Sequence, residues 1–464
     1  MAGFFMPIML VCPYMKGYKA LFKGKKITIM GLGLLGKGYI DPIFLAQCGA
    51  EIIATDLKTK EQLAPTIKKL EKYKNIKFVL GDHRFQDFEN RDFILKNQGV
   101  PLDSPYIAHA HKHGVPIEMD ESLFAKHAPE VMIIGVTGTR GKTMTTHLIY
   151  EILSSARKGV HLAGNLPGKA ALPLLAKVKK GDIVVFELSS WQLQGFGEDK
   201  LSPHISVFTS FMPDHMNYYK NDLDLYFADK ANIFKYQKKG DVLVIRPGMK
   251  KLIPKNIQST LIVANKKNVA GWKFMVPGEH QQENLACAVE VAKQLDIPIS
   301  KIKKAVANFK GVEGRLQYVK TVRGVKIYND NNATTPEATV AGLEALATTV
   351  HTRYGQSIPG RDKNIVLIAG GADKNIELAP LVKGIHKYCK SVILLSGTGT
   401  ERLLKQKLKT ETVAVSNLKD AVRDAMKKAK RGDIVLLSPA FASFGMFVNE
   451  YDRGDQFMKI IKKL

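Results

Sequence analysis

Short hydrophobic runs alternate along this chain with longer segments in which hydrophobic residues recur at helical spacing. Most runs end at a glycine or at a polar side chain. This alternation is typical of strand–helix–strand units, in which parallel strands form a sheet and helices cover its faces. The pattern therefore predicts an α/β fold. The predicted strands lie at residues 26–30, 51–55, 131–134, 182–186, 204–209, 325–328, 364–368, 391–395 and 433–437.

The number of predicted strands indicates several domains. A chain of 464 residues is too long for one ordinary hydrophobic core. We predict an extension at residues 1–24, a Rossmann-like domain at 25–128, a central phosphate-loop domain at 129–313 and a C-terminal Rossmann-like domain at 314–464. An irregular stretch between Thr348 and Asp362 is predicted to be an exposed loop.

The segment 135–143, GVTGTRGKT, lies between a predicted strand and a predicted helix. Gly138 and Gly141 allow the backbone to bend so that successive N–H groups point at one anion. Lys142 is placed to reach the β- and γ-phosphates of a nucleotide, and the Thr143 hydroxyl is placed to bind Mg²⁺. The segment therefore predicts a nucleotide-phosphate loop.

One position departs from the common phosphate-loop pattern. The first glycine of that pattern falls at Val136, and Gly135 lies one residue too early. The alternative is a glycine-rich turn that binds nothing. We favour the phosphate loop because Gly-Lys-Thr has little packing use at this place.

A second glycine-rich segment, GLGLLG, carries glycines at Gly31, Gly33 and Gly36. It follows a predicted strand, and Asp56 ends the next strand about twenty residues later, as in dinucleotide-binding folds. By itself this fingerprint suggests NAD. A tight strand–helix turn without a ligand is the other reading, and an NAD enzyme would leave segment 135–143 without a role.

Polar residues in the central domain suggest a metal site. Glu187 ends a predicted strand close to the phosphate loop, and carboxylate oxygen is a preferred ligand of Mg²⁺. His215 follows the next strand, and Lys230 lies fifteen residues later in a helical stretch. Taken alone, His215 is more often a packed or capping residue and Lys230 a solvated one.

The strands predicted in the last domain also end in small or polar residues. These segments are 329–334, 370–374, 396–399 and 438–443. An open parallel sheet binds ligands beyond the carboxyl ends of its strands. We therefore expect a ligand at this edge.

The charge is strongly basic, with 69 Lys and Arg against 43 Asp and Glu and a net charge of +26. A nucleic-acid partner is one explanation. The lysines are, however, spread along the whole chain, and no arginine-rich arm is present. Solvated lysine-rich helix faces, a lysine-rich proteome or attraction of small anionic substrates also explain the charge, and we favour them over nucleic-acid binding.

The cysteines and the N-terminus bear on the compartment. The four cysteines are far apart and form no CxxC pair, which favours a reducing compartment over disulfides or zinc. The hydrophobic start of the chain is interrupted by Pro7 and lacks a preceding basic region. It is a poor signal peptide and too short to span a membrane. We predict a docked or disordered extension and a cytoplasmic protein.

Taken together, these motifs occur in the order found in the Mur ligases, the ATP-dependent amide-forming enzymes of peptidoglycan precursor synthesis, and the chain resembles that family over roughly residues 25–464. The combination of ELSSWQL with SPA-x-AS is similar to the D-glutamate-adding branch. The matching motifs are GLGLLG, TGTRGKT, GN, ELSSWQL, DHM with a lysine fifteen residues on, GEH with an asparagine four residues on, EGR, ND-x-x-AT, GG-x-x-K, SPA-x-AS and NEYDRG.

The resemblance implies roles for residues around ATP. Two Mg²⁺ ions are implied, one held by Thr143 and Glu187 and one by His215 and a carbamylated Lys230. Asn165 and His215 are implied to lie near the reacting acyl group. The residues implied to bind the nucleotide are Gly138, Thr139, Arg140, Gly141, Lys142, Thr143, Asn284, Arg315 and Asp330.

The resemblance also implies two further substrates, UDP-N-acetylmuramoyl-L-alanine and D-glutamate, and a monomeric enzyme. The UDP end is expected in the first domain and glutamate in the last. The residues implied to bind these substrates are Leu34, Leu35, Asp56, Asn97, Gly99, Asn165, Ser189, Thr334, Lys374 and Ser443.

The implied chemistry is activation of a carboxylate by ATP, which forms an acyl phosphate that the amine of glutamate then attacks. Asn332, Gln281 and Glu450 depart from the family pattern, which usually has lysine, asparagine and an aromatic residue there. Glu450 could change the preference between D- and L-glutamate. Other hypotheses are a different ligase of the same fold, such as a folylpolyglutamate synthase, and a non-catalytic nucleotide- or nucleic-acid-binding protein.

Overall fold

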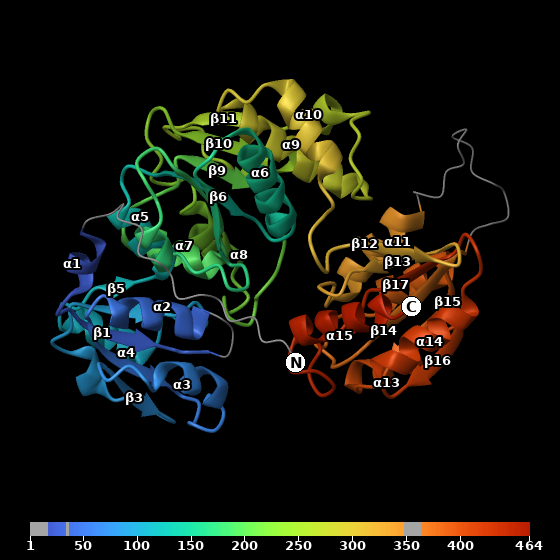
Figure 1. Cartoon of the computed structure of the whole chain (residues 1–464), viewed down its shortest axis with the longest axis horizontal. Coiled ribbons are helices and arrows are strands. Elements are labelled where there is room, and N and C mark those ends of the chain that lie inside the picture. Colours follow the sequence, from blue (N-terminus) through green and yellow to red (C-terminus); the bar gives the residue numbers. More distant parts are fainter. Residues whose placement is uncertain (1–16, 34–36, 348–362) are drawn as a thin grey trace. The chain divides into compact units, whose positions relative to one another are not determined.

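A computed structural model describes residues 17–33, 37–347 and 363–464 (Figure 1). The chain divides into two compact units, and each holds its own sheet or sheets. The first unit comprises the chain up to residue 268 together with 284–302, and the second comprises 269–283 and 303–464. The first unit contains an N-terminal and a central sheet, and the second contains a C-terminal sheet.

The N-terminal sheet has five parallel strands in the order β3-β2-β1-β4-β5, the order of a Rossmann-like fold. Its strands are β1 (Lys26–Met30), β2 (Glu51–Asp56), β3 (Ile76–Leu80), β4 (Phe93–Lys96) and β5 (Ile117–Glu118). The helices are α2 (Lys37–Gln47), α3 (Ala64–Leu70), the 3₁₀ turn η1 (Phe85–Phe88), α4 (Pro105–Lys112) and α5 (Asp120–His127).

The end of the predicted extension docks on this domain. Helix α1 (Tyr18–Phe22) buries Phe22 completely, and the Tyr18 ring stacks on Phe44 at a centroid distance of 5.7 Å. These contacts add apolar burial that holds α1 to α2. The docked alternative is therefore confirmed for this helix, and residues 1–16 lie outside the described residues.

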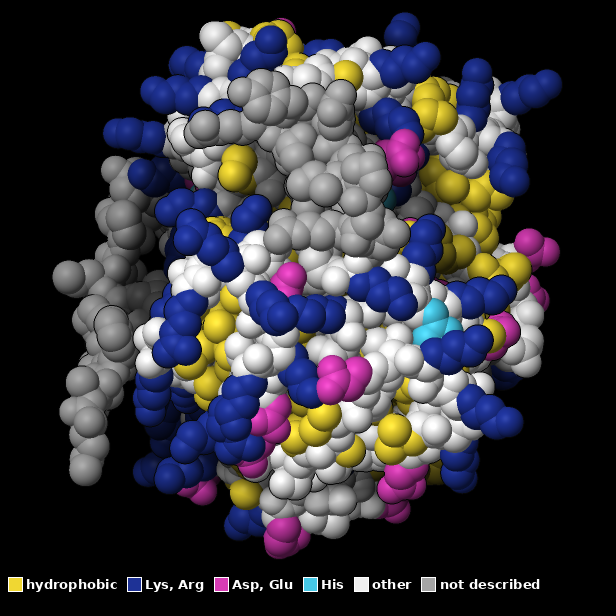
Figure 2. Space-filling view, turned by 90° about the vertical axis from the view of Figure 1, so that its right-hand side faces the viewer, with side chains coloured by type: hydrophobic (Ala, Val, Ile, Leu, Met, Phe, Trp, Pro, Cys, Tyr) yellow, Lys and Arg dark blue, Asp and Glu magenta, His cyan; other side chains and the backbone are white. Residues whose placement is uncertain are grey.

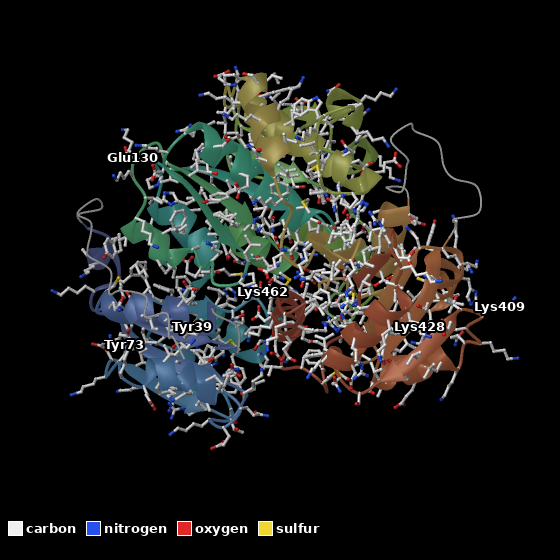
Figure 3. All side chains as sticks on the ribbon, turned by 45° about the vertical axis from the view of Figure 1, so that its right-hand side comes forward. Tyr39, Tyr73, Glu130, Lys409, Lys428 and Lys462 are labelled. Carbon is white, nitrogen blue, oxygen red and sulfur yellow. The ribbon has the colours of Figure 1, made fainter. Side chains whose placement is uncertain are left out.

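Side chains also tie the two helices on one face of this sheet together. The ammonium of Lys69 on α3 lies 3.6 Å from the ring centroid of Tyr39 on α2. Gln47 Nε2 donates to the Tyr73 hydroxyl at 3.3 Å. Both tyrosines are labelled in Figure 3. A cation over an aromatic face adds to the packing of α2 against α3.

The central sheet has six parallel strands in the order β11-β10-β9-β6-β8-β7. These are β6 (Met132–Thr137), β7 (Val160–Gly164), β8 (Ile183–Glu187), β9 (Ile205–Phe208), β10 (Val242–Ile245) and β11 (Thr260–Val263). Its helices are α6 (Lys142–Ala156), α7 (Ser190–Glu198), α8 (Leu223–Ala231), α9 (Glu279–Lys293), α10 (Ile299–Asn308) and the 3₁₀ turns η2 (Leu172–Ala176), η3 (Pro247–Leu252) and η4 (Lys266–Val269).

The C-terminal sheet has the order β12-β13-β17-β14-β15-β16. Its edge strand β12 (Gln317–Val322) runs antiparallel to β13. The other strands are parallel: β13 (Val325–Asn329), β14 (Ile365–Gly370), β15 (Cys389–Leu395), β16 (Glu411–Val415) and β17 (Ile434–Leu437). The helices are α11 (Pro336–Ala347), α12 (Ala379–Tyr388), α13 (Thr398–Leu404), α14 (Leu418–Lys428) and α15 (Glu450–Lys462).

The structure confirms the predicted α/β fold with three sheets, and each of the nine strands predicted from a hydrophobic run is present, with ends that agree to within three residues. The domain boundaries themselves stay a prediction, and the predicted loop between Thr348 and Asp362 lies outside the described residues. The described cysteines, Cys48, Cys287 and Cys389, are all buried. Among the described residues, no helix is both long enough and apolar enough to cross a membrane.

Basic side chains are distributed over the surface. On the face drawn in Figure 2, Lys and Arg side chains are interspersed with hydrophobic, Asp and Glu side chains. Several pair with acids of the same helix or neighbouring strand, as Arg423 does with Asp424 at 3.0 Å. Such exposed pairs each contribute little to stability. They fit the interpretation of the charge as solvated lysine-rich faces.

Candidate nucleotide and substrate site

The phosphate loop connects β6 to α6, as predicted. Gly138 has φ 144° and Gly141, the N-cap of α6, has φ 89°. A Cβ on Gly138 would lie 2.1 Å from Thr209 Oγ1, and one on Gly141 would lie 2.5 Å from Asn284 Oδ1. Both positions therefore require glycine. The loop leads directly into the N-terminus of α6, where backbone N–H groups favour an anion.

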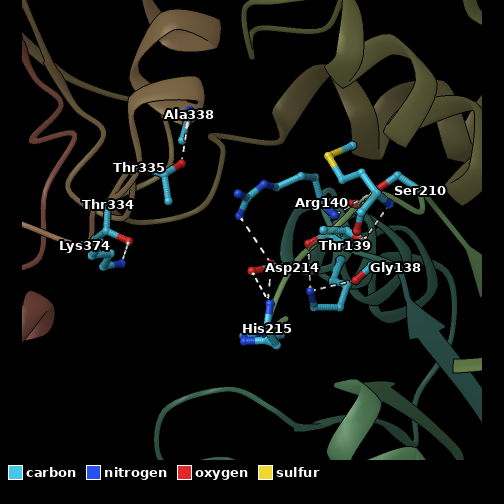
Figure 4. A network of polar contacts seen from close by, with 12 residues as sticks. Gly138, Thr139, Arg140, Ser210, Asp214, His215, Thr334, Thr335, Ala338 and Lys374 are labelled. Carbon is cyan, nitrogen blue, oxygen red and sulfur yellow. Dashed lines mark hydrogen bonds and ion pairs between the residues drawn. The ribbon is translucent and has the colours of Figure 1, made fainter. Parts of the chain in front are cut away.

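The segment after β9 holds the phosphate loop in place. The N–H of Thr139 donates to Ser210 O at 2.8 Å, and that of Arg140 donates to Ser210 Oγ at 2.8 Å. Thr209 Oγ1 donates to Arg140 O at 2.6 Å. Figure 4 shows the contacts around Gly138, Thr139, Arg140 and Ser210. The loop is therefore preorganised by its own domain.

Two lysines converge on one carbonyl of the loop. Lys142 Nζ donates to Gly138 O at 2.9 Å, and Lys230 Nζ donates to the same oxygen at 3.1 Å. Lys230 is 2% exposed. Burial and the nearby Lys142 lower the pKa of Lys230 well below its usual value, and Asp214 and Asp229 oppose that shift. The structure thus brings together two residues predicted to share the site.

Glu187 lies at the end of β8 and is 3% exposed. Its Oε1 accepts a hydrogen bond from Asn165 Nδ2 at 3.3 Å, so these two predicted residues are neighbours. Its Oε2 is buried and has no hydrogen-bond partner among the described residues. A buried carboxylate oxygen without a partner is costly unless a cation occupies its free side. Glu187 therefore fits a Mg²⁺ ligand, and Thr143 is half-buried in the first turn of α6.

His215 lies in a left-handed backbone conformation, with φ 56°, and its ring centroid is 4.5 Å from that of Trp191. Its Nε2 lies 3.9 Å from Asp214 Oδ2. Partial burial lowers the pKa of His215, the lysines of the site lower it further and Asp214 opposes the shift. A neutral imidazole is the form that binds metal.

Asn284 is buried at the foot of the phosphate loop. It accepts hydrogen bonds from Thr145 Oγ1 at 3.1 Å and from Arg246 Nη2. The sequence reading missed Arg246, which follows β10 and lies beside Gly141. The sequence feature that could have identified Arg246 is a basic residue directly after a buried strand of the central domain. Arg246 adds a positive charge at the phosphate loop.

The N-terminal domain contains a cavity of about 520 Å³ at the carboxyl ends of its strands. Three residues predicted to bind substrate line it, namely Asp56, Asn97 and Gly99. Asp56 Oδ2 accepts from the backbone N–H of Leu32 at 2.8 Å and of Gly33 at 3.2 Å. These two hydrogen bonds hold the glycine turn, a structural role of Asp56 that was not predicted from the sequence. Leu34 and Leu35 lie outside the described residues.

Ser189 has a structural task that the sequence reading did not assign to it. It is the N-cap of α7, and Ser189 and Gln192 form a reciprocal capping box. Gln192 in turn donates to Glu121 Oε1. A substrate role for Ser189 therefore stays a prediction beside an observed capping role.

In the second unit, the three residues predicted to bind substrate follow the ends of neighbouring strands. Thr334 follows β13, Lys374 follows β14 and Ser443 follows β17, and these strands are neighbours in the sheet. Lys374 Nζ donates to Thr334 Oγ1 at 3.1 Å (Figure 4). The bridge between Ala372 and Ala442 joins two of the loops. An ammonium beside hydroxyl groups suits a carboxylate ligand.

A buried arginine holds these loops, and the sequence reading missed its role. Arg453 on α15 is completely buried. Its guanidinium donates to Asn331 Oδ1 at 2.7 Å, to Asn331 O at 3.0 Å and to Phe441 O at 3.4 Å. Burial lowers its pKa to about 10. Arg453 thus fixes the segment before Thr334 to the segment before Ser443.

Asp330 and Arg315 also belong to the second unit, and Arg315 is exposed. Both carboxylate oxygens of Asp330 are engaged within the unit, by the N–H of Leu316 at 3.0 Å and by Ser438 Oγ at 2.9 Å. Burial raises the pKa of Asp330 to about 7, against the opposing effect of these hydrogen bonds. Nucleotide contacts by Asp330 and Arg315 stay a prediction.

Asp330 should make the stability of this unit depend on pH. Its native pKa of about 7 lies above the unfolded value, so between pH 4 and pH 7 the unfolded state loses a proton that the native state keeps. The free energy of unfolding should therefore fall by a few kcal/mol across this interval and level off above it. Urea unfolding of Asp330→Asn should lack this slope, whereas Asp455→Asn, an exposed change on α15, should retain it. Identical slopes in Asp330→Asn and the unmodified protein would contradict the assignment.

Comparison with known families matches all three domains in order. Models of the Mur ligase MurD-like N-terminal domain, the Mur ligase middle domain and the Mur ligase glutamate ligase domain match residues 25–118, 136–265 and 314–441. The phosphate loop, Glu187, His215 and Lys230 all fall within the middle match. Thr334 and Lys374 fall within the third, and Ser443 lies two residues beyond it.

Curated relatives are similar to this chain over nearly its whole length. The UDP-N-acetylmuramoylalanine–D-glutamate ligase of Borreliella burgdorferi is 34% identical over 473 residues, covering 95% of this chain and 98% of the relative. That of a Roseiflexus species is 34% identical over 478 residues with the same coverage. The crystal structure of UDP-N-acetylmuramate-alanine ligase from Thermotoga maritima, 18% identical, shares the fold with a TM-score of 0.60 over 95% of this chain and 99% of that one.

Proposed function

This chain belongs to the Mur ligase family, and we propose that it joins D-glutamate to UDP-N-acetylmuramoyl-L-alanine, with cleavage of ATP, in peptidoglycan synthesis. The observation that carries this function is the likeness to D-glutamate ligases over 95% of the chain. The ATPase loop, the UDP-side cavity and the carboxylate-binding loops then each have a task in one reaction.

The first step is transfer of the γ-phosphoryl group of ATP to the substrate carboxylate, which gives an acyl phosphate and ADP. Both reactants are anions, so the barrier is largely electrostatic. Lys142, Arg246 and the N-terminus of α6 supply positive charge around the loop. The amine of D-glutamate then attacks the acyl carbon, and phosphate leaves as the amide forms. ATP contacts by Thr139, Arg140, Asn284, Arg315 and Asp330 are part of this proposal.

Two Mg²⁺ ions would neutralise phosphate charge when bound. The unpartnered Glu187 oxygen fits the first, with Thr143 as the second protein ligand. His215 and Lys230 would hold the other, provided that Lys230 is carbamylated, because an ammonium cannot bind a cation. A lowered pKa favours the uncharged amine of Lys230, which is the form that reacts with CO₂. Asn165, bonded to Glu187, would orient the acyl group.

We propose that the second unit binds the amino-acid substrate. Its carboxylates would meet Lys374, Thr334 and Ser443, because a dicarboxylate needs cationic and hydroxyl donors. Glu450, which stands where the family usually has an aromatic residue, begins α15, and its backbone oxygen accepts from Asn331. The UDP end would lie in the N-terminal cavity beside Asp56. We further propose a monomer that acts in the cytoplasm.

ADP release by the purified protein tests this function. With ATP, Mg²⁺ and UDP-N-acetylmuramoyl-L-alanine present, we expect turnover to depend on D-glutamate and to be at least tenfold faster than with L-glutamate. Turnover with L-glutamate alone would retain the ligase mechanism and overturn the stereochemical assignment. No turnover with any amino acid would overturn the function, and salt-sensitive nucleic-acid binding would then be measured instead.

A further inference from the structure

Two histidines and a glutamate converge on the surface of the N-terminal domain, and none of them is among the residues assigned above. His109 lies on α4, and His113 is the C-cap of that helix. Glu89 Oε1 lies 2.7 Å from His109 Nε2 and 4.0 Å from His113 Nε2. Within residues 17–33, 37–347 and 363–464, these are the one group of three acidic, histidine or cysteine side chains whose ligand atoms all lie within 4.8 Å of one another.

The two imidazole rings are oriented for this arrangement. His113 Nδ1 lies 2.9 Å from the carbonyl oxygen of His109. A carbonyl only accepts, so Nδ1 carries the proton and Nε2 of the neutral ring keeps its lone pair, which lies on the side of Glu89. This is the outer contact that usually accompanies a metal-binding histidine. The His109 ring packs against Phe85 at a centroid distance of 4.9 Å, which restricts its rotation.

We propose that Glu89, His109 and His113 form a binding site for a divalent late transition-metal ion, with Zn²⁺ as the best fit. Two imidazole nitrogens four residues apart, together with one carboxylate, suit Zn²⁺ and not Mg²⁺. Zn–N distances of about 2.0–2.1 Å place tetrahedral ligands about 3.3 Å apart. Small shifts of Glu89 and His113 from the observed separations satisfy that geometry.

Access and the fourth ligand follow from the exposure of the site. The side chains of Glu89, His109 and His113 are 33%, 22% and 39% exposed. An ion can therefore enter from solvent, and water can complete the coordination. Zinc sites with three protein ligands can hold a water molecule in the fourth position. The hydrogen bond between His109 and Glu89 would be replaced by two bonds to the ion.

Binding would act on the wall of the N-terminal cavity. The first turn of α4 carries Tyr106, which lines that cavity and contacts Phe85 at a centroid distance of 4.7 Å. Glu89 directly follows η1, the turn that contains Phe85. An ion held between Glu89 and α4 would therefore clamp η1 to the helix. The clamp stabilises the native state, because the ion binds the folded arrangement of all three ligands.

Zinc titration of the whole chain tests the site. After removal of metal with a chelator, and with excess Mg²⁺ present to occupy oxygen-ligand sites, we expect one Zn²⁺ to bind with a Kd of about 10 µM or tighter. His109→Gln and His113→Gln should each weaken binding at least tenfold. His111→Gln is the matched control, because His111 is an exposed histidine on the same helix and is not in the group.

Cobalt provides a second measurement that is independent of ligase activity. Co²⁺ in a four-coordinate site absorbs visible light much more strongly than in water, so the unmodified protein and His111→Gln should show the band and His113→Gln should lack it. Equal zinc affinity in the three variants, or a loss in His111→Gln as large as in the others, would overturn the proposal. Unfolding midpoints without metal should agree between His111→Gln and His113→Gln, since both histidines are exposed at the surface.

Discussion

Replacing Lys142 by alanine is expected to lower kcat/KM for ATP by about 10²–10³-fold. The reason is the place of its ammonium group, which lies against the Gly138 and Thr139 carbonyls at the entrance to α6. No other lysine starts this helix, so its charge cannot be supplied by a neighbour on α6. ADP release under saturating D-glutamate measures the effect, and a separate fluorescence titration with ATP tells binding apart from turnover.

Lys158→Ala provides the control for that experiment. Lys158 lies just beyond the other end of α6 and is exposed, so this change removes the same charge from the same segment without touching the phosphate loop. Its kcat/KM should stay within about twofold of the unmodified protein. The urea midpoint of unfolding should be unchanged in Lys142→Ala, because Lys142 is only half-buried. A Lys142→Ala protein that turns over at the normal rate would refute the role of the loop.

The phosphate loop was predictable because its conformation depends on local residues. Gly138 and Gly141 have positive φ, which favours glycine, and Lys142 follows them at the start of a helix. All of these residues are close together in the sequence, so the motif can be recognised there. Nine strands were predicted for a similar reason, because each contains a run of mostly hydrophobic residues that are largely buried in a sheet. Eight further strands among the described residues were not predicted, namely β3, β4, β5, β7, β10, β11, β12 and β16. Neither inference needs a contact between distant segments.

The contacts that the sequence reading missed join segments far apart in the chain. Arg246 donates a hydrogen bond to Asn284, and buried Lys96 donates one to Gln194 at 3.3 Å. The sequence around these residues does not indicate which distant residue each one bonds. The antiparallel edge strand β12 was missed because its side chains are all exposed or half-buried and it forms no continuous hydrophobic run. Partners of this kind are set by tertiary packing.

Some residues have two candidate tasks, and sequence alone cannot separate them. Asp330 was predicted to contact the nucleotide, yet it also holds Leu316 and Ser438. Asp56 lines the cavity and also ties the glycine turn. A carboxylate with four lone-pair positions can serve both tasks. Asp56→Asn and Asp330→Asn variants therefore need a stability measurement beside any activity measurement.

Glu187→Gln is expected to lower kcat by about 10²-fold and at the same time to stabilise the metal-free protein by about 1 kcal/mol. Both effects come from the same atom. The buried Oε2 has no hydrogen-bond partner among the described residues. Burying its negative charge without a cation therefore lowers the free energy of unfolding, whereas an uncharged amide of nearly equal size lowers it less. With the charge removed, however, Mg²⁺ loses a ligand beside the phosphates.

Unfolding midpoints with and without Mg²⁺ and ATP separate the two effects. The unmodified protein should gain stability from the pair of ligands, whereas Glu187→Gln should start higher and gain much less. Glu187→Asp is the matched comparison, because it keeps the charge but withdraws it by one methylene; it should lose activity without the gain in metal-free stability. Normal activity of Glu187→Gln at low Mg²⁺ would rule out this carboxylate as a ligand. Activity and metal-free stability that change in opposite directions would instead show that Glu187 is kept, at a cost to folding, for the metal that it binds.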